Sequence, residues 1–280
     1  MSYRKTDLAY ERSAESSSPS LSCHREMRGK YCLHVATETE KADGSIPVGR
    51  HVTLLFPKDG EALPDYEGEL SLQISRILRE EGARLLGDDD FSKRRVLFIG
   101  LGNAAATADA FGPITARHIR PTAQIERESP ALFSLLSCAA LAVFCPGVSS
   151  ACGMESTALL SAVISAFRPE LLLIADSLVA ADPAHLGRAL QFSDSGIRPG
   201  GGIGCHGEAI DRFFAGCPVL SIGLPTAVHV STLLRELGVS DPPSAIGEEH
   251  YLSPASVDRM IDGIAREAAR AVESTFGLPY

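Results

Sequence analysis

The sequence predicts an α/β fold, a single domain in which a mainly parallel sheet carries helices on both faces. Two observations predict this fold. From about residue 50 onward, short apolar runs alternate with segments of helical periodicity, the order typical of parallel sheets. Several of these runs are nearly continuous in Val, Ile, Leu and Phe, as in strands covered on both faces.

Six apolar runs are the expected strands. They span residues 52–56, 96–100, 141–145, 171–175, 189–192 and 219–222. Between the first two runs, an amphipathic helix is predicted by the helical spacing of Leu70, Ile74, Ile77, Leu78 and Leu85. Residues 159–167 are apolar almost all round, which predicts a deeply buried helix that ends at Arg168-Pro169.

The last helix is expected to begin near residue 254. Ser253 fits its N-cap position and Pro254 its first helical position. One apolar stripe then runs along the helix through Val257, Met260, Ile261, Ile264 and Val272. This periodicity predicts a helix that packs on the sheet by a single face.

Residues 1–30 are expected to be a flexible N-terminal extension, and residues 31–280 the α/β domain. Residues 13–22 are Ser-rich and lack apolar periodicity, which is typical of a flexible linker. A short TDLA segment at residues 6–9 precedes this linker.

Composition and charge narrow the classes of function. Hydrophobic residues make up 45% and charged residues 22%, so the chain can bury a core without metals or disulfides. The net charge of −9 and the lack of a Lys/Arg cluster argue against direct nucleic-acid binding. No apolar run approaches the ~20 residues that span a bilayer. The first residues are too polar for a signal peptide, so a cytoplasmic protein without membrane contact is expected.

The seven cysteines do not follow a metal-binding or disulfide pattern, because they are odd in number and contain no CxxC pair. Buried, reduced thiols are therefore expected. Cys23-His24 and Cys205-His206 are two isolated pairs that give weak support to a zinc site.

Two acidic residues follow predicted strands at the sheet edge where open α/β proteins form their sites. Asp109 comes after the strand at 96–100 and a turn through Asn103, and Asp176 follows the strand at 171–175. Both carboxylates are therefore expected to face one cleft. The alternatives are that Asp109 caps or charges a helix N-terminus and that Asp176 begins a turn.

A carboxylate pair is suited to peptide hydrolysis. Two close carboxylates do not both ionise readily, so one keeps a proton near neutral pH. The ionised member then takes a proton from water, and the protonated member polarises a carbonyl. The same pair can instead hold a divalent metal that activates the water, and the sequence leaves both mechanisms open. No serine, cysteine or HExxH signature is present.

Asp194 precedes a Gly-rich run that contains Gly201 and Gly202. By position alone, Asp194 is either a site residue or a turn former. The glycines can cradle an anion or let an extended substrate approach the backbone. The run lacks the Lys-Ser/Thr ending of a P-loop, so nucleotide binding is not expected.

At these residues the sequence resembles the germination protease family, which degrades small acid-soluble proteins in bacterial spores. The matching segments include TDLA at 6–9, GLGN at 100–103, DAFGP at 109–113, GME at 153–155, Asp176 in its strand context and QFSDSGIRPGGGIG at 191–204. The resemblance implies an α/β fold shared with hydrogenase-maturation endopeptidases, with Asp109 and Asp176 as the catalytic pair. Supporting or substrate-binding roles are expected for Asn103, Glu155, Asp194, Gly201 and Gly202.

The resemblance further implies a zymogen that cuts itself between Asp7 and Leu8, a homotetramer, and small acid-soluble spore proteins as substrates within the spore core or forespore. No cofactor is expected, and hydrolysis without a tightly bound metal is expected because no ligand cluster accompanies the two Asp residues. A divalent metal is not excluded. Two other interpretations stay open: a metal-dependent maturation-type endopeptidase, and a non-catalytic spore protein with the same fold.

The sequence also departs from the pattern of the family it resembles. A segment is missing between about residues 231 and 252, and residues 104–108 read AAATA. Ala151 stands where the family often has Gln, and Ala181-Asp182 replaces a segment that commonly holds Arg. Substrate contacts are therefore expected to differ.

Overall fold

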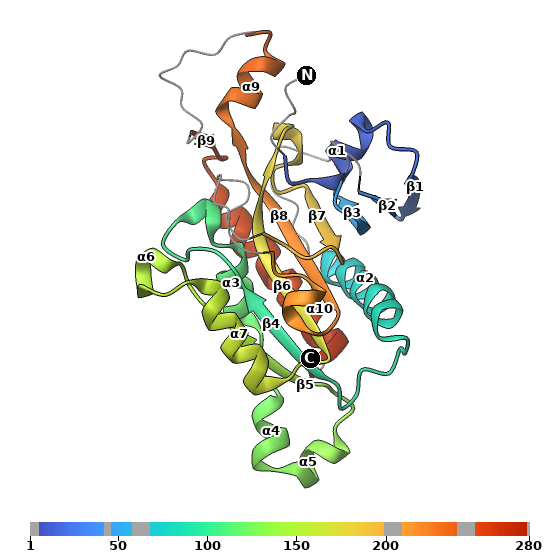
Figure 1. The fold of residues 1–280 in the computed structure, drawn as a ribbon, viewed down its shortest axis with the longest axis vertical. Helices are drawn as coiled ribbons and strands as arrows, with labels where there is room; N and C mark the ends of the chain where they lie inside the picture. The colour runs from blue at the N-terminus through green and yellow to red at the C-terminus, as the bar shows by residue number, and fades with distance from the viewer. Residues whose placement is uncertain (1–5, 42–45, 58–67, 199–208, 240–249, 279–280) are drawn as a thin grey trace.

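The computed structural model describes residues 6–41, 46–57, 68–198, 209–239 and 250–278. Within them, a central sheet has the strand order β1-β2-β3-β7-β8-β6-β4-β5, and β9 pairs with β8 outside this path (Figure 1). The strands are β1 (Leu21–Arg28), β2 (Tyr31–Glu38), β3 (Gly49–Leu55), β4 (Arg95–Gly100), β5 (Ala140–Phe144), β6 (Leu171–Ala180), β7 (Ala189–Ser193), β8 (Val219–His229) and β9 (Tyr251–Leu252).

The helices follow the strands in the alternation that the sequence predicts. They are α1 (Ala9–Glu15), α2 (Glu69–Leu86), η1 (Thr107–Asp109), α3 (Phe111–His118), α4 (Ala123–Glu128), α5 (Pro130–Leu135), α6 (Ser149–Cys152), α7 (Ser156–Phe167), η2 (Pro183–His185), α8 (Arg212–Ala215), α9 (Val230–Glu236) and α10 (Val257–Phe276). The predicted α/β class is confirmed.

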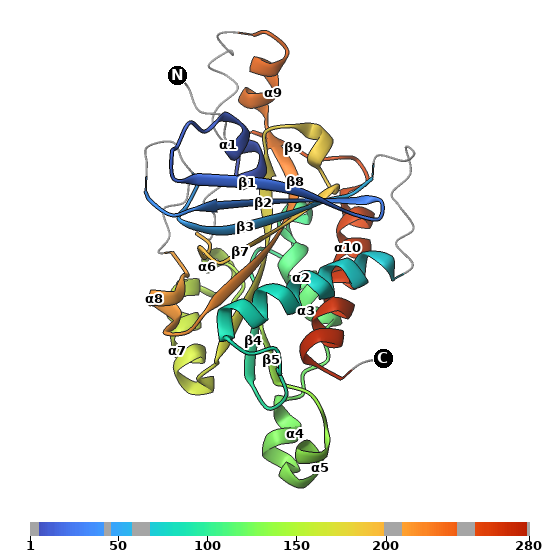
Figure 2. The ribbon, with the colours of Figure 1, turned by 90° about the vertical axis from the view of Figure 1, so that its right-hand side faces the viewer.

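The sheet has a parallel part and an antiparallel part. The strands β5, β4, β6 and β8 run parallel to one another. On the other side of β8, the strands β7, β3, β2 and β1 pair antiparallel in succession. Figure 2 shows β1, β2 and β3 lying crosswise to the parallel strands, as the twist of a large sheet produces.

Both faces of the parallel strands are covered by helices, which explains why their sequences are almost continuously apolar. On one face, Val96 and Phe98 of β4 pack in a core with residues of α2, α3 and α10. On the other face, Leu97 and Ile99 pack against Leu160 of α7 and neighbouring side chains. Figure 2 shows α2 and α10 on one side of the sheet and α7 and α8 on the other.

The N-terminal segment differs from the flexible extension that the sequence predicts. Residues 9–15 form α1, Leu8 is fully buried, and β1 pairs with β2 along its whole length. Most side chains of β1 are exposed, so this strand is held by backbone hydrogen bonds rather than by an apolar face. A hydrophobic pattern cannot reveal such a strand.

The last helix begins later than predicted, although its buried stripe is correct. Ser256, not Ser253, precedes the first helical residue, Val257. The amide of Val257 donates to the carbonyl of Pro254, so Pro254 lies in a turn before the helix. The predicted stripe of Met260, Ile261, Ile264 and Val272 is buried against the sheet.

One glycine allows α3 to approach the parallel strands. A Cβ on Gly112 would lie 2.2 Å from the carbonyl oxygen of Leu101 and 2.3 Å from that of Ala175. Both contacts are with backbone atoms, which cannot rotate away. The absence of a side chain at Gly112 therefore fixes the distance between α3 and the ends of β4 and β6.

We expect Gly112→Ala to lower the free energy of unfolding by about 2–4 kcal/mol, because α3 must move away from both strands. Gly263→Ala in α10 is the matched control, since its Cβ would meet no atom within 4 Å. That change should raise stability by about 0.5–1 kcal/mol, as for Gly in a helix interior. Urea unfolding midpoints measure both effects, and equal midpoints for the two variants would contradict this packing.

Candidate active site

Asp176 lies inside β6 and not after it, so the predicted strand end at Ala175 is wrong. Asp176 pairs with Gly223 of β8, and the two strands stay paired as far as Ala180 and Val228. The sequence hides this continuation because polar residues interrupt the apolar run, and because Pro225 lies within β8. The register shifts beside this proline, between Leu178 and Val179, which lets both strands continue. Asp176 is therefore a buried strand residue and does not begin a turn.

Asp109 is the last residue of η1, a short turn of helix between β4 and α3. The amide of Asn103 donates both to Oδ2 of Asp109, at 2.9 Å, and to its backbone carbonyl, at 3.0 Å. The hydroxyl of Thr226 on β8 donates to the carbonyl of Ala108, at 2.6 Å. The residue that precedes α3 is Ala110 and no side chain caps this helix, so Asp109 does not act as its N-cap.

The side chains of Asp109 and Asp176 lie near enough for the charge of one to act on the other. The amide of Leu101 donates to the carbonyl of Ala175 at 2.9 Å, which joins the end of β4 to β6 next to Asp176. Burial raises the pKa of Asp176 well above its ordinary value, and the charge of Asp109 raises it further. The Ser177 amide, which donates to Asp176 at 2.9 Å, only partly offsets this rise.

The two carboxyl groups have different surroundings. Asp176 is 7% exposed, whereas Asp109 is half-buried. Burial also raises the pKa of Asp109, and the hydrogen bond from Asn103 opposes that rise. Unequal environments push the pKa values of two neighbouring carboxyl groups apart. Asp176, which is more deeply buried, therefore retains its proton more strongly than Asp109.

A third carboxyl group, that of Asp7, lies near Asp176. The amide of Asp7 donates to the carbonyl of Val179 at 2.8 Å, and the amide of Val179 donates to Oδ2 of Asp7 at 2.9 Å. Burial raises the pKa of Asp7, and the charge of Asp7 contributes to the raised pKa of Asp176. The segment in which self-cleavage is expected is thus folded against β6, near Asp176.

The other predicted site residues lie in different places. The side chain of Asn103 accepts from the amide of Ala105 at 2.9 Å and shapes the turn that holds Asp109. Glu155 is exposed immediately before α7, and its backbone carbonyl accepts from amides of that helix. Gly201 and Gly202 lie outside the described residues.

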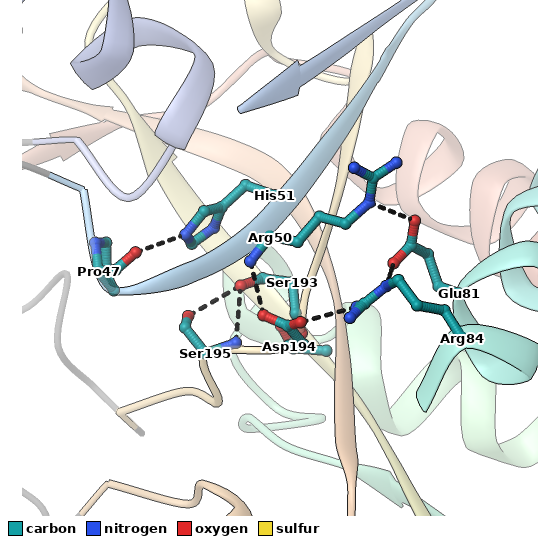
Figure 3. A network of polar contacts seen from close by, with 9 residues as sticks. Pro47, Arg50, His51, Glu81, Arg84, Ser193, Asp194 and Ser195 are labelled. Atoms are coloured by element: carbon teal, nitrogen blue, oxygen red, sulfur yellow. Dashed lines mark hydrogen bonds and ion pairs between the residues drawn. The ribbon is translucent and has the colours of Figure 1, made fainter. Parts of the chain in front are cut away.

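Asp194 belongs to an ion-pair network that joins β3, β7 and α2 (Figure 3). Its Oδ1 accepts from the backbone amide of Arg50 at 2.7 Å, and its Oδ2 accepts from the Arg84 guanidinium at 2.7 Å. Buried Glu81 accepts from both arginines, each at 2.8 Å. Asp194 therefore engages the Arg84 guanidinium and the backbone of β3.

Gln191 of β7 is the residue that sequence reasoning missed. Its side-chain amide contacts the backbone of the N-terminal segment at Asp7 and Ala9. The available signal is a polar residue between Leu190 and Phe192, both of which are fully buried. A buried amide in an apolar strand needs specific hydrogen-bond partners, so it marks a position where the strand binds something polar.

The described part of the chain contains neither a disulfide among its cysteines nor a cluster of side chains that could bind a metal. Cys23, Cys32, Cys138, Cys145 and Cys217 are free thiols. Cys138 is buried as expected, but Cys23 and Cys145 are exposed, which differs from the prediction of buried thiols. No group of three or more His, Cys, Asp or Glu side chains is arranged to hold a metal among the described residues.

Comparison with known proteins identifies a family with these features. The model of the germination protease family matches residues 26–237 of the chain. A germination protease from Caldanaerobacter subterraneus subsp. tengcongensis is 32% identical over 197 residues, which cover 70% of this chain and 58% of the relative. A Clostridium perfringens germination protease is 28% identical over 199 residues, which cover 71% and 59%.

One further relative and one solved structure were also similar to the chain. A germination protease from Bacillus subtilis is 28% identical over 189 residues, which cover 67% of this chain and 50% of the relative. The aligned segments thus span less than three-fifths of these relatives. A [NiFe] hydrogenase maturation protease, HycI from Thermococcus kodakarensis, covers 66% of this chain and 97% of its own at 17% identity, with a TM-score of 0.38. No described helix is both long enough and apolar enough to cross a membrane.

Because the pKa of Asp176 is raised, the stability of the fold should depend on pH. Below the ordinary value of 3.8, its carboxyl is neutral in the folded and unfolded chains alike. As the pH rises through the raised folded value, charging the buried group removes stability. We therefore expect Asp176→Asn to raise the melting temperature at pH 8 by about 3 °C or more, and by progressively less as the pH approaches 4.

Asp262 provides the matched control for this titration. Its hydrogen bond with Arg266 lowers its pKa, so its stabilising effect is present above 3.8 and is lost as the pH falls. Asp262→Asn should therefore lower the melting temperature slightly, by an amount that changes little between pH 8 and pH 4. Thermal unfolding from pH 4 to 8 measures the melting temperatures of both variants. If the effect of Asp176→Asn on the melting temperature does not change with pH, Asp176 is not a buried carboxyl with a raised pKa.

Proposed function

The chain belongs to the germination protease family, and from this premise we propose that it is a self-processing endopeptidase that degrades small acid-soluble, DNA-protecting spore proteins. The observation that supports this proposal most is the charge-coupled pair of Asp109 and buried Asp176, with the TDLA segment bound to the strand that carries Asp176. We further propose that it acts in the spore interior as a homo-oligomer.

In the proposed mechanism the two carboxyl groups take different roles. Asp109 is the more exposed and accepts a hydrogen bond from Asn103, which favours its ionised form. It serves as the base that takes a proton from the attacking water. Asp176 is buried and keeps its proton, so it polarises the carbonyl of the peptide bond under attack.

The proposed zymogen is cut between Asp7 and Leu8. Contacts on both sides of this bond support its presentation to the site. Upstream, Asp7 pairs with Val179 of β6. Downstream, the Glu11 carboxylate accepts from the amides of Ala181 and Asp182, at 2.7 and 2.9 Å, and contacts Nδ1 of His185 at 2.7 Å. Attachment within the chain raises the effective concentration of the bond at the site, to about the millimolar range for a short tether.

Asp109→Asn or Asp176→Asn should lower the rate of cleavage of a purified small acid-soluble spore protein by about 10²–10⁴-fold, because an amide neither accepts the water's proton nor donates as an acid. Asp262→Asn, on the exposed face of α10, should cleave at the wild-type rate. Gel-based cleavage assays with and without a chelator measure these rates. Near-normal turnover in a folded pair variant would contradict the assignment, and loss of wild-type activity on chelation would favour a metal-activated water.

The zymogen proposal predicts a change in mass. During mild acidification, the wild-type protein should lose residues 1–7, whereas Asp109→Asn should keep them because the pair no longer activates water. Intact-mass spectrometry measures both chains over time. Because this segment makes few contacts compared with the whole core, its loss should change activity more than stability. A full-length wild type that is fully active would rule out the zymogen.

A further inference from the structure

The main chain around the Asp7–Leu8 bond is held by one side chain, that of Gln191, which contacts Asp7 before the bond and Ala9 one residue beyond Leu8. Its Nε2 donates to the backbone carbonyl of Asp7 at 3.1 Å, and its Oε1 accepts from the backbone amide of Ala9 at 2.5 Å. Gln191 is only 9% exposed. The carbonyl of Asp7 is the one that would be attacked in self-cleavage, so Gln191 contacts the reacting group directly.

The register of the sheet places Gln191 beside the carboxylate pair. Asp176 on β6 pairs with Gly223 on β8, and Gly223 pairs with Gln191 on β7. Residues paired across neighbouring strands direct their side chains to the same face. Asp176 and Gln191 therefore share one face, two strands or roughly 10 Å apart, on either side of a residue that has no side chain.

The residue after the bond fills an apolar pocket on this same face. Leu8 is fully buried and packs with Leu178, Ala180 and Val228. Leu178 and Ala180 alternate with Asp176 along β6, which places the pocket next to the pair. The side chain of Leu178 leans over Gly223, where a Cβ would lie 2.3 Å from it.

The acidic side chain before the bond is also bound by the main chain. The amide of Val179 donates to Oδ2 of Asp7, and the carbonyl of Val179 accepts from the amide of Asp7. A backbone amide that donates to a carboxylate distinguishes Asp from an apolar residue at this position. Together, these contacts bind an extended segment that has an acidic residue before the cut and an aliphatic residue after it.

We propose that Gln191 is a substrate-binding residue of the active site, which clamps the main chain across the bond to be cut and donates to its carbonyl oxygen. The inference rests on the proposed function, because it takes Asp7–Leu8 as a bond that the chain cleaves. The same clamp receives the main chain of protein substrates once the N-terminal segment has left.

The donated hydrogen bond has a defined place in the hydrolysis. The oxygen of water forms a bond to the carbonyl carbon of Asp7, and negative charge develops on the oxygen that faces Nε2 of Gln191. Asp109 takes a proton from the attacking water, the bond from that carbon to the nitrogen of Leu8 then breaks, and the same proton passes to the nitrogen. The products are a new carboxyl group on Asp7 and a free amine on Leu8. A donor aimed at this oxygen stabilises the charge as it forms.

The test compares self-cleavage rates of full-length variants by intact-mass spectrometry. Gln191→Ala removes both hydrogen bonds. Gln191→Glu, followed at neutral pH and above so that its carboxyl is ionised, keeps an acceptor for Ala9 but removes the donor to Asp7. Both should slow cleavage by roughly 10²-fold or more, as for the loss of an oxyanion donor. The control Gln124→Glu changes an exposed amide on α4 in the same way and should cleave at the wild-type rate.

A second measurement separates the donor from a structural role. In the uncleaved Asp109→Asn background, amide hydrogen exchange at Ala9 reports whether the segment stays bound to the sheet. Gln191→Glu should keep this amide protected, whereas Gln191→Ala should lose the protection. If Gln191→Glu cleaves slowly while its Ala9 amide stays protected, the segment is still bound, and the slow cleavage is due to the missing hydrogen-bond donor. Loss of protection in Gln191→Glu would overturn the role of the donor.

The outcomes for the two proposals are distinguishable. If the wild type cuts both itself and a spore protein, and the Gln191 variants do so at the same rate, the clamp is wrong and the proposed function stands. If the wild type cuts neither, the proposed function fails, and with it the role of Gln191 as a substrate-binding residue.

Discussion

The burial of Asp176 in the middle of a parallel strand is the constraint on which the site depends. A carboxylate at this position loses its hydration, and Asp109 adds a second negative charge nearby. Proteins tolerate such a group by keeping it protonated, which costs less than burying the charge. The turn through Asn103 and the close packing of Gly112 hold Asp109 in place, so the unfavourable pair is maintained by the fold around it.

Strands from both parts of the sheet hold the extended N-terminal segment, β6 from the parallel part and β7 from the antiparallel part. The row formed by Asp176, Gly223 and Gln191 crosses from the parallel strands into the antiparallel ones. The N-terminal segment lies on that row, with Asp7 bound by Val179 and Leu8 buried in an apolar pocket. The segment thus contacts β6, the strand that carries Asp176, on one side of β8 and β7 on its other side.

Sequence patterns revealed the parts of the fold that bury apolar side chains. The strands β4, β5, β6 and β8 were predictable because both of their faces are covered, and so was the buried stripe of α10. The strand β1 was not, because its exposed side chains leave only backbone pairing to hold it. The proximity of Asp109 and Asp176 followed from topology, whereas the contacts of Gln191 depend on the register of three strands, which no local pattern encodes. Asp194 has the composition of a site residue, but its partners are the arginines of β3 and α2.

The central claim is that Asp176 and Asp109 form one electrostatically coupled pair. Titration of the aspartate side-chain carboxyl carbons by NMR, in the wild type and in Asp109→Asn, measures this coupling directly. The account predicts that Asp176 titrates well above 3.8 in the wild type and that its pKa falls when the charge at position 109 is removed. An Asp176 carboxyl that titrates near 3.8, or whose pKa is the same in both proteins, would contradict it.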